Sequence, residues 1–519
     1  MKKLNKYHKI WAILIILSFI FGFSQNIIAQ LPQVYDLRSY NLVTAVKNQD
    51  TCGSCWAFAS IASIESSLLK KGIGTYNLSE DNLIDCHSFD ESPCTGGSYY
   101  MANALFTRHQ GPLLTTNDSY TPFSKNCPFS YSLPPSIPFY LEDIRFLPKN
   151  TGIVKQAIYS NGAIATTMFF NITNYNSTTN KYYDNVIDST DEAHCVTLVG
   201  WNDTMSFSGT TNKGGWIVKD SYGTSWAQQG FFYVSYYDAG ILTETAYFPT
   251  IYDIPLSSNK SNVYYHDYYG WVDNYGFSGS SSSNIAYGLA IYTITPFSGV
   301  VVPQQIKRIG TYAVADSTTI TIEIYKSYSG GALSDLIASK SQFCEFKGFY
   351  TLSFSLPTDT INTNIYIKAT YQTPTNITKP IPVEKYEAYH TTNISLSSNS
   401  CYISSNAQNW ILTGTGSNYA FDLCIKMFTE DAPKSILTSN KDTICAGSMI
   451  NLIDSTTVKD SIQWFVDGNY YNNSQNNNII FNSSGLVDIS LVAHLGKNTD
   501  TSHKIICVLP APSTPSINR

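Results

Sequence analysis

The chain has 519 residues, a net charge of −6 and eleven cysteines. A chain of this length is too long for one ordinary domain, so we expect several. Because the net charge is acidic and no basic cluster follows the N-terminus, we do not expect nucleic acid as a partner.

The N-terminus predicts a secretory signal peptide over residues 1–29. Lysines at positions 2, 3, 6 and 9 precede the apolar run 11–23, and Ala29 follows as the candidate cleavage position. The run is too short to span a bilayer, and no other stretch approaches the required length. We therefore expect a secreted chain without a membrane span, whose cysteines meet an oxidising environment.

Residues 52–58, Cys-Gly-Ser-Cys-Trp-Ala-Phe, place a cysteine at the start of a predicted helix. After Cys55, apolar residues recur at spacings of three and four until residues 70–72 end the pattern. The unpaired N–H groups and the macrodipole at a helix N-terminus favour the thiolate, which is the nucleophilic form of cysteine. Cys55 is thus the candidate nucleophile.

Three interpretations of Cys52 and Cys55 compete. A redox dithiol would lie in a short βαβ pattern, and a zinc site would favour a second close cysteine pair, whereas seven residues separate Cys86 from Cys94. The third interpretation is a nucleophile beside a structural cysteine. Residues 46–58 resemble the active-site segment of the papain-like cysteine proteases, with its C-G-S-C-W signature, and this resemblance favours the third.

A nucleophilic thiolate needs a general base and a group that orients the base. Residues 192–201 are typical of a buried strand and resemble the family's histidine strand, so His194 is the candidate base. Residues 215–226 are similar to the family's K-N-S-W-G-x-x-W block, with Asp220 at the orienting asparagine and Tyr222 at a shielding tryptophan. A carboxylate still accepts from the imidazole, and it stabilises the imidazolium more than an amide does.

The resemblance implies further site residues. Gln49 aligns with the glutamine whose side chain joins the Cys55 backbone N–H in an oxyanion hole. Asp50 replaces a family glycine, so we expect the local turn to differ. A peptide substrate would pair with exposed backbone at the C-x-G-G segment. The candidate substrate-binding residues are Gly96, Gly97 and Trp226.

The resemblance also implies two disulfides, Cys52–Cys94 and Cys86–Cys127. An odd cysteine total agrees with one free nucleophile. Cys195, which follows the candidate base, is interpreted as a buried apolar thiol, with a second reactive group as the alternative.

Acidic residues gather at Asp81, Asp85, Asp90 and Glu91. They lack the spacing of a calcium loop, so we expect a solvated acidic loop, and we expect neither a metal nor a cofactor. Leu31 begins a segment that resembles the mature N-terminus of the family, close behind the signal peptide. We therefore expect an enzyme that is active once folded and oxidised, or one controlled from the C-terminal half.

Composition shifts near residue 252, where helical periodicity gives way to short alternating strands between Gly, Ser and Asn turns. Residues 262–428 resemble the lectin-like domain of some bacterial papain-like proteins. Aromatic residues between Tyr264 and Trp271 offer a stacking surface for glycans, or a plain sheet surface. Residues 437–508 resemble PKD-like modules, with Cys445 and Cys507 placed to pair.

The expected architecture is an α+β papain-like fold over residues 30–252, with a helical L domain and a β-barrel-like R domain. Two all-β sandwich domains follow. The expected function is a secreted or bacterial cell-surface cysteine endopeptidase acting on protein or peptide substrates, with glycans as candidate partners of the second domain. The alternative is an adhesive or carbohydrate-binding surface protein whose protease fold is catalytically degenerate.

Overall fold

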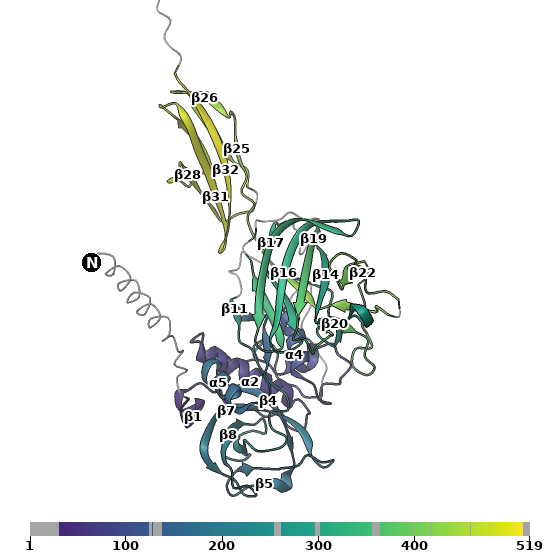
Figure 1. Cartoon of the computed structure of the whole chain (residues 1–519). Helices are drawn as coiled ribbons and strands as arrows, with labels where there is room; N and C mark the ends of the chain where they lie inside the picture. The colour runs from purple at the N-terminus through teal and green to yellow at the C-terminus, as the bar shows by residue number, and fades with distance from the viewer. Residues whose placement is uncertain are drawn as a thin grey trace, which may run out of the picture.

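The computed structural model describes residues 31–123, 127, 137–253, 261–295, 302–354, 356, 364–397, 399–416, 418–456 and 458–511. The predicted signal peptide lies outside these residues. Figure 1 shows three units in chain order: a two-lobed unit, a β-sandwich against it, and a narrow all-β unit beyond the sandwich. Within the described ranges, no helix is long and apolar enough to cross a bilayer.

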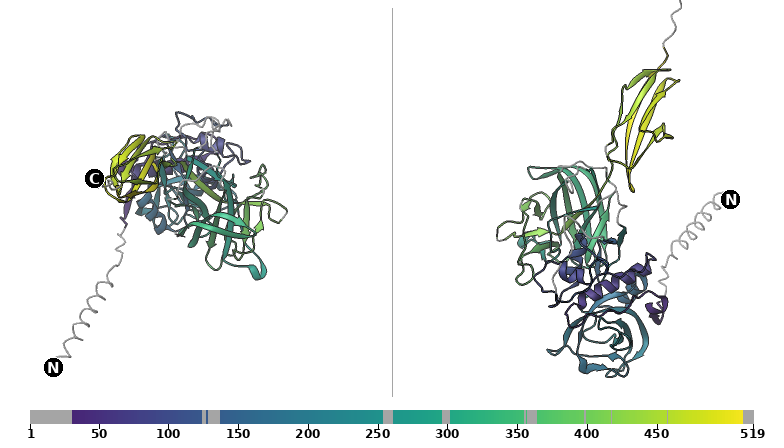
Figure 2. Two further views of the ribbon diagram at one scale, coloured as in Figure 1. Left: turned by 90° about the horizontal axis from the view of Figure 1, so that it is seen from above. Right: turned by 180° about the vertical axis from the view of Figure 1, so that it is seen from behind.

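A helical lobe opens the first unit and is built around one long helix. Its helices are α2 (Cys55–Lys70), α3 (Asp81–Cys86) and α4 (Tyr99–Thr107). The apolar residues of α2 are buried, and the helix ends just before Gly72, which takes a φ of +69°. Ser98 caps α4 by accepting from the Met101 amide. The helix predicted to begin at Cys55 is confirmed. In Figure 2 the purple helices lie between the teal strands of the second lobe and the green sandwich.

A curved sheet forms the second lobe. Its elements are β1 (Val34–Asp36), β4 (Ile164–Phe170), β5 (Tyr175–Asn176), β6 (Lys181–Tyr182), β7 (Glu192–Ser206), β8 (Lys213–Lys219), β9 (Phe231–Ser235), β10 (Thr245–Tyr247) and helix α5 (Thr151–Asn161). β7 pairs with β4 on one side and with β8 on the other, both antiparallel. Trp201 and Trp216 are fully buried in the core of this lobe. The buried strand predicted over residues 192–201 is confirmed.

The middle unit is a sandwich of two antiparallel sheets with a small third sheet, β13-β20-β23, beside them. Its strands are β12 (Ser261–Tyr265), β13 (Asp273–Tyr275), β14 (Ile285–Thr293), β15 (Gln304–Ala313), β16 (Thr318–Ser329), β17 (Ala332–Cys344), β18 (Gly348–Ser353), β19 (Asn364–Gln372), β20 (Ile381–Lys385), β21 (Cys401–Ser404), β22 (Ile411–Leu412), β23 (Phe421–Leu423) and β24 (Ile425–Asp431). One sheet runs β17-β16-β19-β14-β21-β22, and β12-β24-β15-β18 faces it. Along β16, buried and half-buried residues alternate, because one face packs on the core.

The first two units share a sheet. β3 (Ile144–Phe146) pairs with β10 of the first unit and with β18 of the sandwich, so the strand order continues from one unit into the next. β2 (Phe139–Leu141) pairs with β11 (Ile251–Asp253) beside this junction. The hydrophobic core around α2 and α4 accordingly includes Tyr312, Phe349 and Phe428 of the sandwich.

The third unit has two sheets around one tryptophan. Its strands are β25 (Leu437–Ser439), β26 (Thr443–Cys445), β27 (Met449–Asp454), β28 (Ser461–Val466), β29 (Asn469–Asn472), β30 (Asn476–Ile480), β31 (Gly485–Leu495) and β32 (Asn498–Leu509). Trp464 is 1% exposed in its core. The predicted pairing of Cys445 with Cys507 is wrong, because both thiols are free. The parallel register of β26 and β32 sets Thr443 opposite Cys507, which offsets the two cysteines.

Three of the aromatic residues that open the sandwich, Tyr268, Tyr269 and Trp271, contact the first unit. Tyr269 is 4% exposed and contacts Phe89, and the Tyr268 ring lies 4.1 Å from the guanidinium carbon of Arg108. Trp271 packs edge-on against Tyr100, in the helical lobe. The stacking surface expected from the sequence is therefore part of an internal interface.

The acidic residues after residue 80 do not form a solvated loop, so that prediction is wrong. Asp81 and Asp85 are 2% exposed, and Asp81 accepts from the amide and hydroxyl of Thr121. Asp90 accepts from the Thr392 amide of the sandwich. These carboxylates tie chain segments together. Among the described residues, no group of His, Cys, Asp and Glu side chains could hold a metal ion.

Candidate active site

Three elements converge on Cys55 at the boundary between the two lobes. Cys55 is the first residue of α2, His194 is the third residue of β7, and Asp220 directly follows β8. The pairing of Thr197 with Lys219 brings the start of β7 beside the end of β8. α2 packs across β7 and β4, so its N-terminus meets the histidine strand. Residues more than 130 positions apart thereby become neighbours.

His194 and Asp220 form a buried pair. The imidazole Nε2 donates to Asp220 Oδ1 at 2.9 Å, and the same oxygen accepts from the Ser221 amide at 2.8 Å. Burial would lower the pKa of His194, but the charge and hydrogen bond of Asp220, together with the Cys55 thiolate, raise it to about 10. Since Nε2 is held by Asp220, the other ring nitrogen is left to face Cys55.

The Cys55 thiol has its pKa held well below the usual range. The thiol of Cys195 donates a hydrogen bond to it, and the hydrogen bond and positive charge of His194 act in the same direction against burial. The start of α2 adds the positive end of its macrodipole. A thiolate beside an imidazolium is therefore the favoured state of this pair.

Cys195 is the residue whose position the sequence did not reveal. It is buried, as predicted, yet its sulfur also lies 3.4 Å from Thr167 Oγ1 and its hydrogen bond to Cys55 raises its own pKa well above the usual value. A protonated thiol is not a nucleophile, which argues against the second-reactive-group interpretation. Adjacent residues of a regular strand face opposite sides, so nothing in the sequence pattern placed both His194 and Cys195 against Cys55.

Tyr222, which the resemblance aligns with the family's shielding tryptophan, covers His194. Its ring stacks on His194 with centroids 5.0 Å apart and planes 5° apart. Trp226 meets the edge of Tyr222 at 5.8 Å and stacks on Tyr175. An aromatic shield over the imidazole is thus present, and Trp226 supports the shield instead of contacting the histidine itself.

Gln49 is fixed from both sides. Its side-chain Nε2 donates to the Cys52 carbonyl at 2.7 Å, and its Oε1 accepts from the Ser221 hydroxyl at 2.5 Å. Ser221 neighbours Asp220, so the amide and the histidine partner are held by one segment. The second N–H of the Gln49 amide is available for an oxyanion.

Asp50 adopts the turn that a glycine would favour. Its φ is +52°, in the left-handed region, where aspartate is tolerated better than most residues. Asn48 stabilises this turn, since its side chain accepts from the Asp50 amide and donates to the Asp50 carboxylate. The expectation that this turn differs from the family's stays a prediction.

Two disulfides hold the chain segments around the start of α2 and the glycine segment 96–97. Cys52 is bonded to Cys94 and Cys86 to Cys127, as the resemblance implied. The Gly53 amide donates to the Cys94 carbonyl at 3.2 Å, which ties the start of α2 to the glycine segment. Gly97 exposes its backbone and packs on Trp56, where an added Cβ would lie 2.3 Å from the indole. Gly96 has a φ of +112°. Both positions therefore require glycine.

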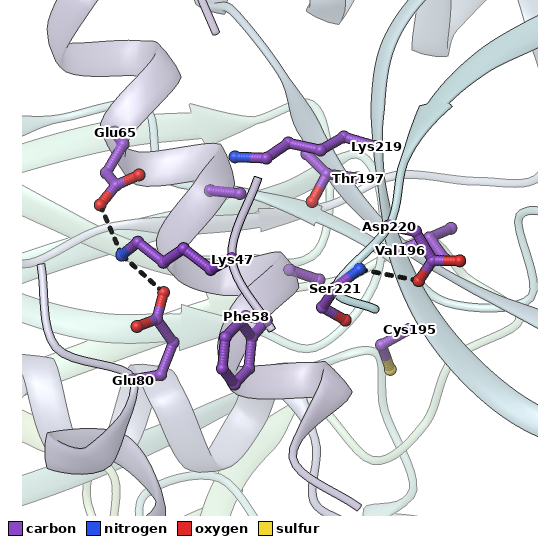
Figure 3. A pocket seen from close by; sticks show the side chains of 12 residues that line it. Lys47, Phe58, Glu65, Glu80, Cys195, Val196, Thr197, Lys219, Asp220 and Ser221 are labelled. Carbon is purple, nitrogen blue, oxygen red and sulfur yellow. Dashed lines mark hydrogen bonds and ion pairs between the residues drawn. The ribbon is translucent and has the colours of Figure 1, made fainter. Parts of the chain in front are cut away.

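Behind the site lies a buried charge cluster that the sequence did not reveal. Lys47, two residues before Gln49, donates to Glu65 at 3.0 Å and to Glu80 at 2.8 Å. Figure 3 shows Lys47 between these two carboxylates, with Lys219 and Asp220 on the opposite side of the same small space. Burial raises the pKa of Glu80 to about 7, against the attraction of Lys47. The cluster anchors the Gln49 segment to α2.

The geometry agrees with comparisons to known proteins. Residues 31–249 match the family described as papain family cysteine protease, and residues 263–429 match the lectin-like domain family. The first unit is a papain-family protease domain. Viral cathepsins of Cydia pomonella granulosis virus and Autographa californica nuclear polyhedrosis virus are each 32% identical to it. The matches cover 40% and 39% of this chain and 58% and 59% of the cathepsins, so the chain spans less than two thirds of these relatives.

Solved structures share the arrangement of the papain-family domain and the sandwich. The clostridial cysteine protease Cwp84 after propeptide cleavage is similar with a TM-score of 0.64 at 22% identity, covering 77% of this chain and 99% of that one. The protease and lectin-like domains of Cwp84, a surface layer associated protein of Clostridium difficile, give 0.63 at 20% identity, over 78% and 90%. These likenesses show the fold. The PKD-like assignment of residues 437–508 stays a prediction.

Proposed function

We propose that the protein is a cysteine endopeptidase in which the Cys55 thiolate attacks the scissile carbonyl of a peptide. The observation that carries this proposal is the buried hydrogen bond from His194 to Asp220, with the imidazole directed at a thiol of lowered pKa. A nucleophile, a base and a group that orients the base are the parts that acyl transfer requires.

The reaction follows from these positions. The thiolate adds to the carbonyl, and the imidazolium of His194 gives its proton to the leaving amine. Neutral His194 then takes a proton from water, which hydrolyses the thioester and frees Cys55. We propose that the Gln49 amide and the Cys55 backbone N–H donate to the oxyanion of each tetrahedral intermediate; the bond from Gln49 to the Cys52 carbonyl, close to the start of α2, supports this.

The substrate we propose is an extended polypeptide lying along Gly96 and Gly97. The exposed backbone of Gly97 offers hydrogen bonds to a peptide main chain, and the Cys52–Cys94 bond holds this segment beside the nucleophile. The disulfides and the predicted signal peptide support an extracellular site of action. Glycans are proposed as ligands of the lectin-like sandwich, at a surface other than the aromatic segment that packs on the protease domain.

The rival function, an adhesive protein with a degenerate protease fold, draws its support from Asp220 and Tyr222. In the structure Asp220 accepts from the imidazole and Tyr222 stacks on it, so neither departure removes a required contact. Nothing in these two positions therefore favours loss of activity.

Hydrolysis of an internally quenched peptide with both ends blocked tests the proposal. The parent chain should cleave it, and Cys55→Ala should lower kcat/KM by at least about 10³-fold, as loss of a nucleophile does. Cys445→Ala, which removes a free thiol in the third unit, is the matched control and should leave the rate unchanged. Equal rates for the parent and Cys55→Ala would refute the proposal.

A further inference from the structure

A buried lysine and two buried carboxyl groups lie together inside the sandwich, away from the candidate active site. Lys426 on β24, Asp267 just after β12 and Glu384 on β20 are each 0% exposed. β12 and β24 are neighbours, with Tyr265 opposite Lys426, so Asp267, two residues past the end of β12, lies beside Lys426. Nothing in the proposed peptidase function uses these residues.

Lys426 and Asp267 are in direct contact. The Lys426 Nζ lies 2.6 Å from Asp267 Oδ2 and 2.8 Å from the Asp267 carbonyl oxygen. The other carboxyl oxygen of Asp267, Oδ1, has no hydrogen-bond partner within the described residues. The amine is therefore already in contact with a carboxyl group whose second oxygen has no hydrogen-bond partner among the described residues.

Glu384 completes the group. Its Oε2 accepts from the Tyr269 amide at 2.6 Å, and its Oε1 is buried with no partner in the described part of the chain. Charges on Asp267 and Lys426 both act on its pKa, which burial raises well above the usual value, so Glu384 is close to the pair and favours its protonated form. A neutral, buried carboxylic acid can both give and accept a proton.

A simple ion pair explains this arrangement poorly. Taking a lysine and a carboxylate fully out of water costs free energy. Their mutual attraction offsets that cost only where the remaining donors and acceptors are satisfied. Within the described part of the chain, one oxygen of Asp267 and one of Glu384 have no hydrogen-bond partner, and Asp422, also fully buried, adds a third carboxyl group whose Oδ1 has none. Burial raises the pKa of Asp267 as well, which favours its neutral acid form.

We propose that Lys426 and Asp267 are joined by an intramolecular amide bond, formed within the folded sandwich with Glu384 as the proton carrier. The neutral Lys426 amine attacks Asp267 Cγ, and a C–N bond forms. Glu384 takes the proton released by nitrogen and returns one to the departing hydroxyl. The Cγ–O bond breaks and one water molecule leaves, so no oxidant, metal or cofactor is needed.

The bond would close the sandwich covalently. It would link β12, the first strand of the sandwich, to β24, the last, across 159 residues of sequence. A cross-link over so long a loop restricts the unfolded chain much as a disulfide does, and it does so without being reducible. β24 leads directly into the third unit. When the chain is pulled from its C-terminal side, the link would therefore carry the force across the sandwich and keep it folded.

Peptide mapping of the full chain, reduced and alkylated, tests the proposal. The Cys55→Ala variant avoids self-cleavage and keeps the sandwich unchanged. We expect a branched peptide containing residues 267 and 426 that is lighter than its two parts by one water molecule, with no tryptic cleavage after Lys426. Separate, unmodified peptides for the two residues would overturn the proposal, whatever any variant does.

Two variants and an internal control sharpen the result. Lys426→Arg should give no branched peptide, and Glu384→Gln, which still accepts from the Tyr269 amide, should give little or none. Lys385 and Asp273 form an ion pair of similar length, 2.7 Å, at the exposed surface, and their peptides should remain separate. A branched peptide of undiminished yield in Glu384→Gln would remove Glu384 from the reaction. Recovery of the same loss of water in Lys426→Arg would contradict the assignment of the bond.

Discussion

Asp220 gives the candidate active site a full negative charge where family members carry a neutral amide. The carboxylate holds the imidazolium of His194, whose pKa rises to about 10. Activity requires Cys55 as thiolate and His194 as imidazolium, so the active form should exist from the low pKa of Cys55 up to the raised pKa of His194. Asp220 thereby extends the alkaline side of the range.

Replacing Asp220 separates its charge from its geometry. Asp220→Asn keeps an acceptor for Nε2 but removes the charge that raises the pKa of His194, so the alkaline limb of kcat/KM should move to lower pH. Asp220→Ala removes the acceptor too, and the rate should fall by about 10²- to 10⁴-fold. The pH profiles of both variants against the parent are the measurement. Profiles identical to the parent would mean that Asp220 does not act on His194.

Cys195 should tune the nucleophile without reacting itself. Cys195→Ala removes a hydrogen-bond donor from the Cys55 thiolate, so the pKa of Cys55 should rise and the acid limb of activity should shift to higher pH. The pH dependence of Cys55 alkylation measures this directly. Cys344→Ala, which removes a buried thiol from the sandwich, is the control and should leave the limb in place. An unshifted limb in Cys195→Ala would contradict the contact.

At the scale of single residues, candidate site residues could be predicted where a local periodic pattern or a family motif includes them. Cys55 begins an apolar helical pattern, and His194 begins an apolar strand. Cys195 and Tyr120 carry no such mark, because their roles depend on segments that meet only in the fold. Tyr120, for example, donates to the Gln49 carbonyl from 71 residues away.

Among the elements, the segment with Gly96 and Gly97 beside the start of α2 tolerates substitution least, because both positions require glycine. Gly97→Ala would place a Cβ 2.3 Å from the Trp56 ring, and this ring belongs to the turn that follows Cys55. The segment must then move away from the nucleophile. We expect KM for a peptide to rise about tenfold or more, a loss of about 1.4 kcal/mol in binding.

Gly96→Ala provides the comparison. An added Cβ at Gly96 meets no atom of the described residues within 4 Å, but its φ of +112° is strained for alanine. The variant should lose about 1–3 kcal/mol of stability with a smaller change in KM. Steady-state kinetics and urea unfolding of both variants distinguish steric from conformational demand. Equal KM values for the parent and Gly97→Ala would contradict the placement of the substrate.

Elements whose burial follows from their own periodicity were predictable, such as α2, β7 and the alternating β16. The short strand β3 was not. Its three residues pair with β10 and β18, which come from different units, and no local pattern encodes a partner about 200 residues away. Local patterns therefore indicate single strands and helices, but they do not indicate the sheet that the first two units share.

At the scale of the whole molecule, the interface between the protease domain and the sandwich contains buried charged side chains beside its apolar contacts. Glu142 of the first unit is fully buried, and Arg308 of β15 donates to both of its oxygens at 2.5 and 2.8 Å. His109 also binds Glu142, at 2.7 Å, and stacks on Tyr140. A protease domain cut off near residue 252 would keep His109 but lose Arg308 as a partner of this carboxylate, and it would leave the β18 side of β3 unpaired.

Arg308→Met tests this interface. Removing one partner of a buried pair leaves an uncompensated charge, so we expect a loss of about 3–5 kcal/mol, seen as a lower urea midpoint for both units together. Lys385→Met breaks an exposed ion pair with Asp273 and should cost about 1 kcal/mol or less. If Arg308→Met unfolds at the same urea concentration as Lys385→Met, the two units do not depend on this contact.

Labelling with a thiol-reactive epoxide inhibitor of papain-type proteases shows whether Cys55 is the nucleophile of a peptidase. Mass mapping of the native full chain should find one inhibitor per chain, on Cys55, with loss of peptide hydrolysis in step with labelling. Cys445→Ala should label like the parent, and Cys55→Ala should not label. Rapid labelling that persists in Cys55→Ala, or a folded parent chain that takes up no inhibitor, would contradict the assignment of Cys55 as the nucleophile.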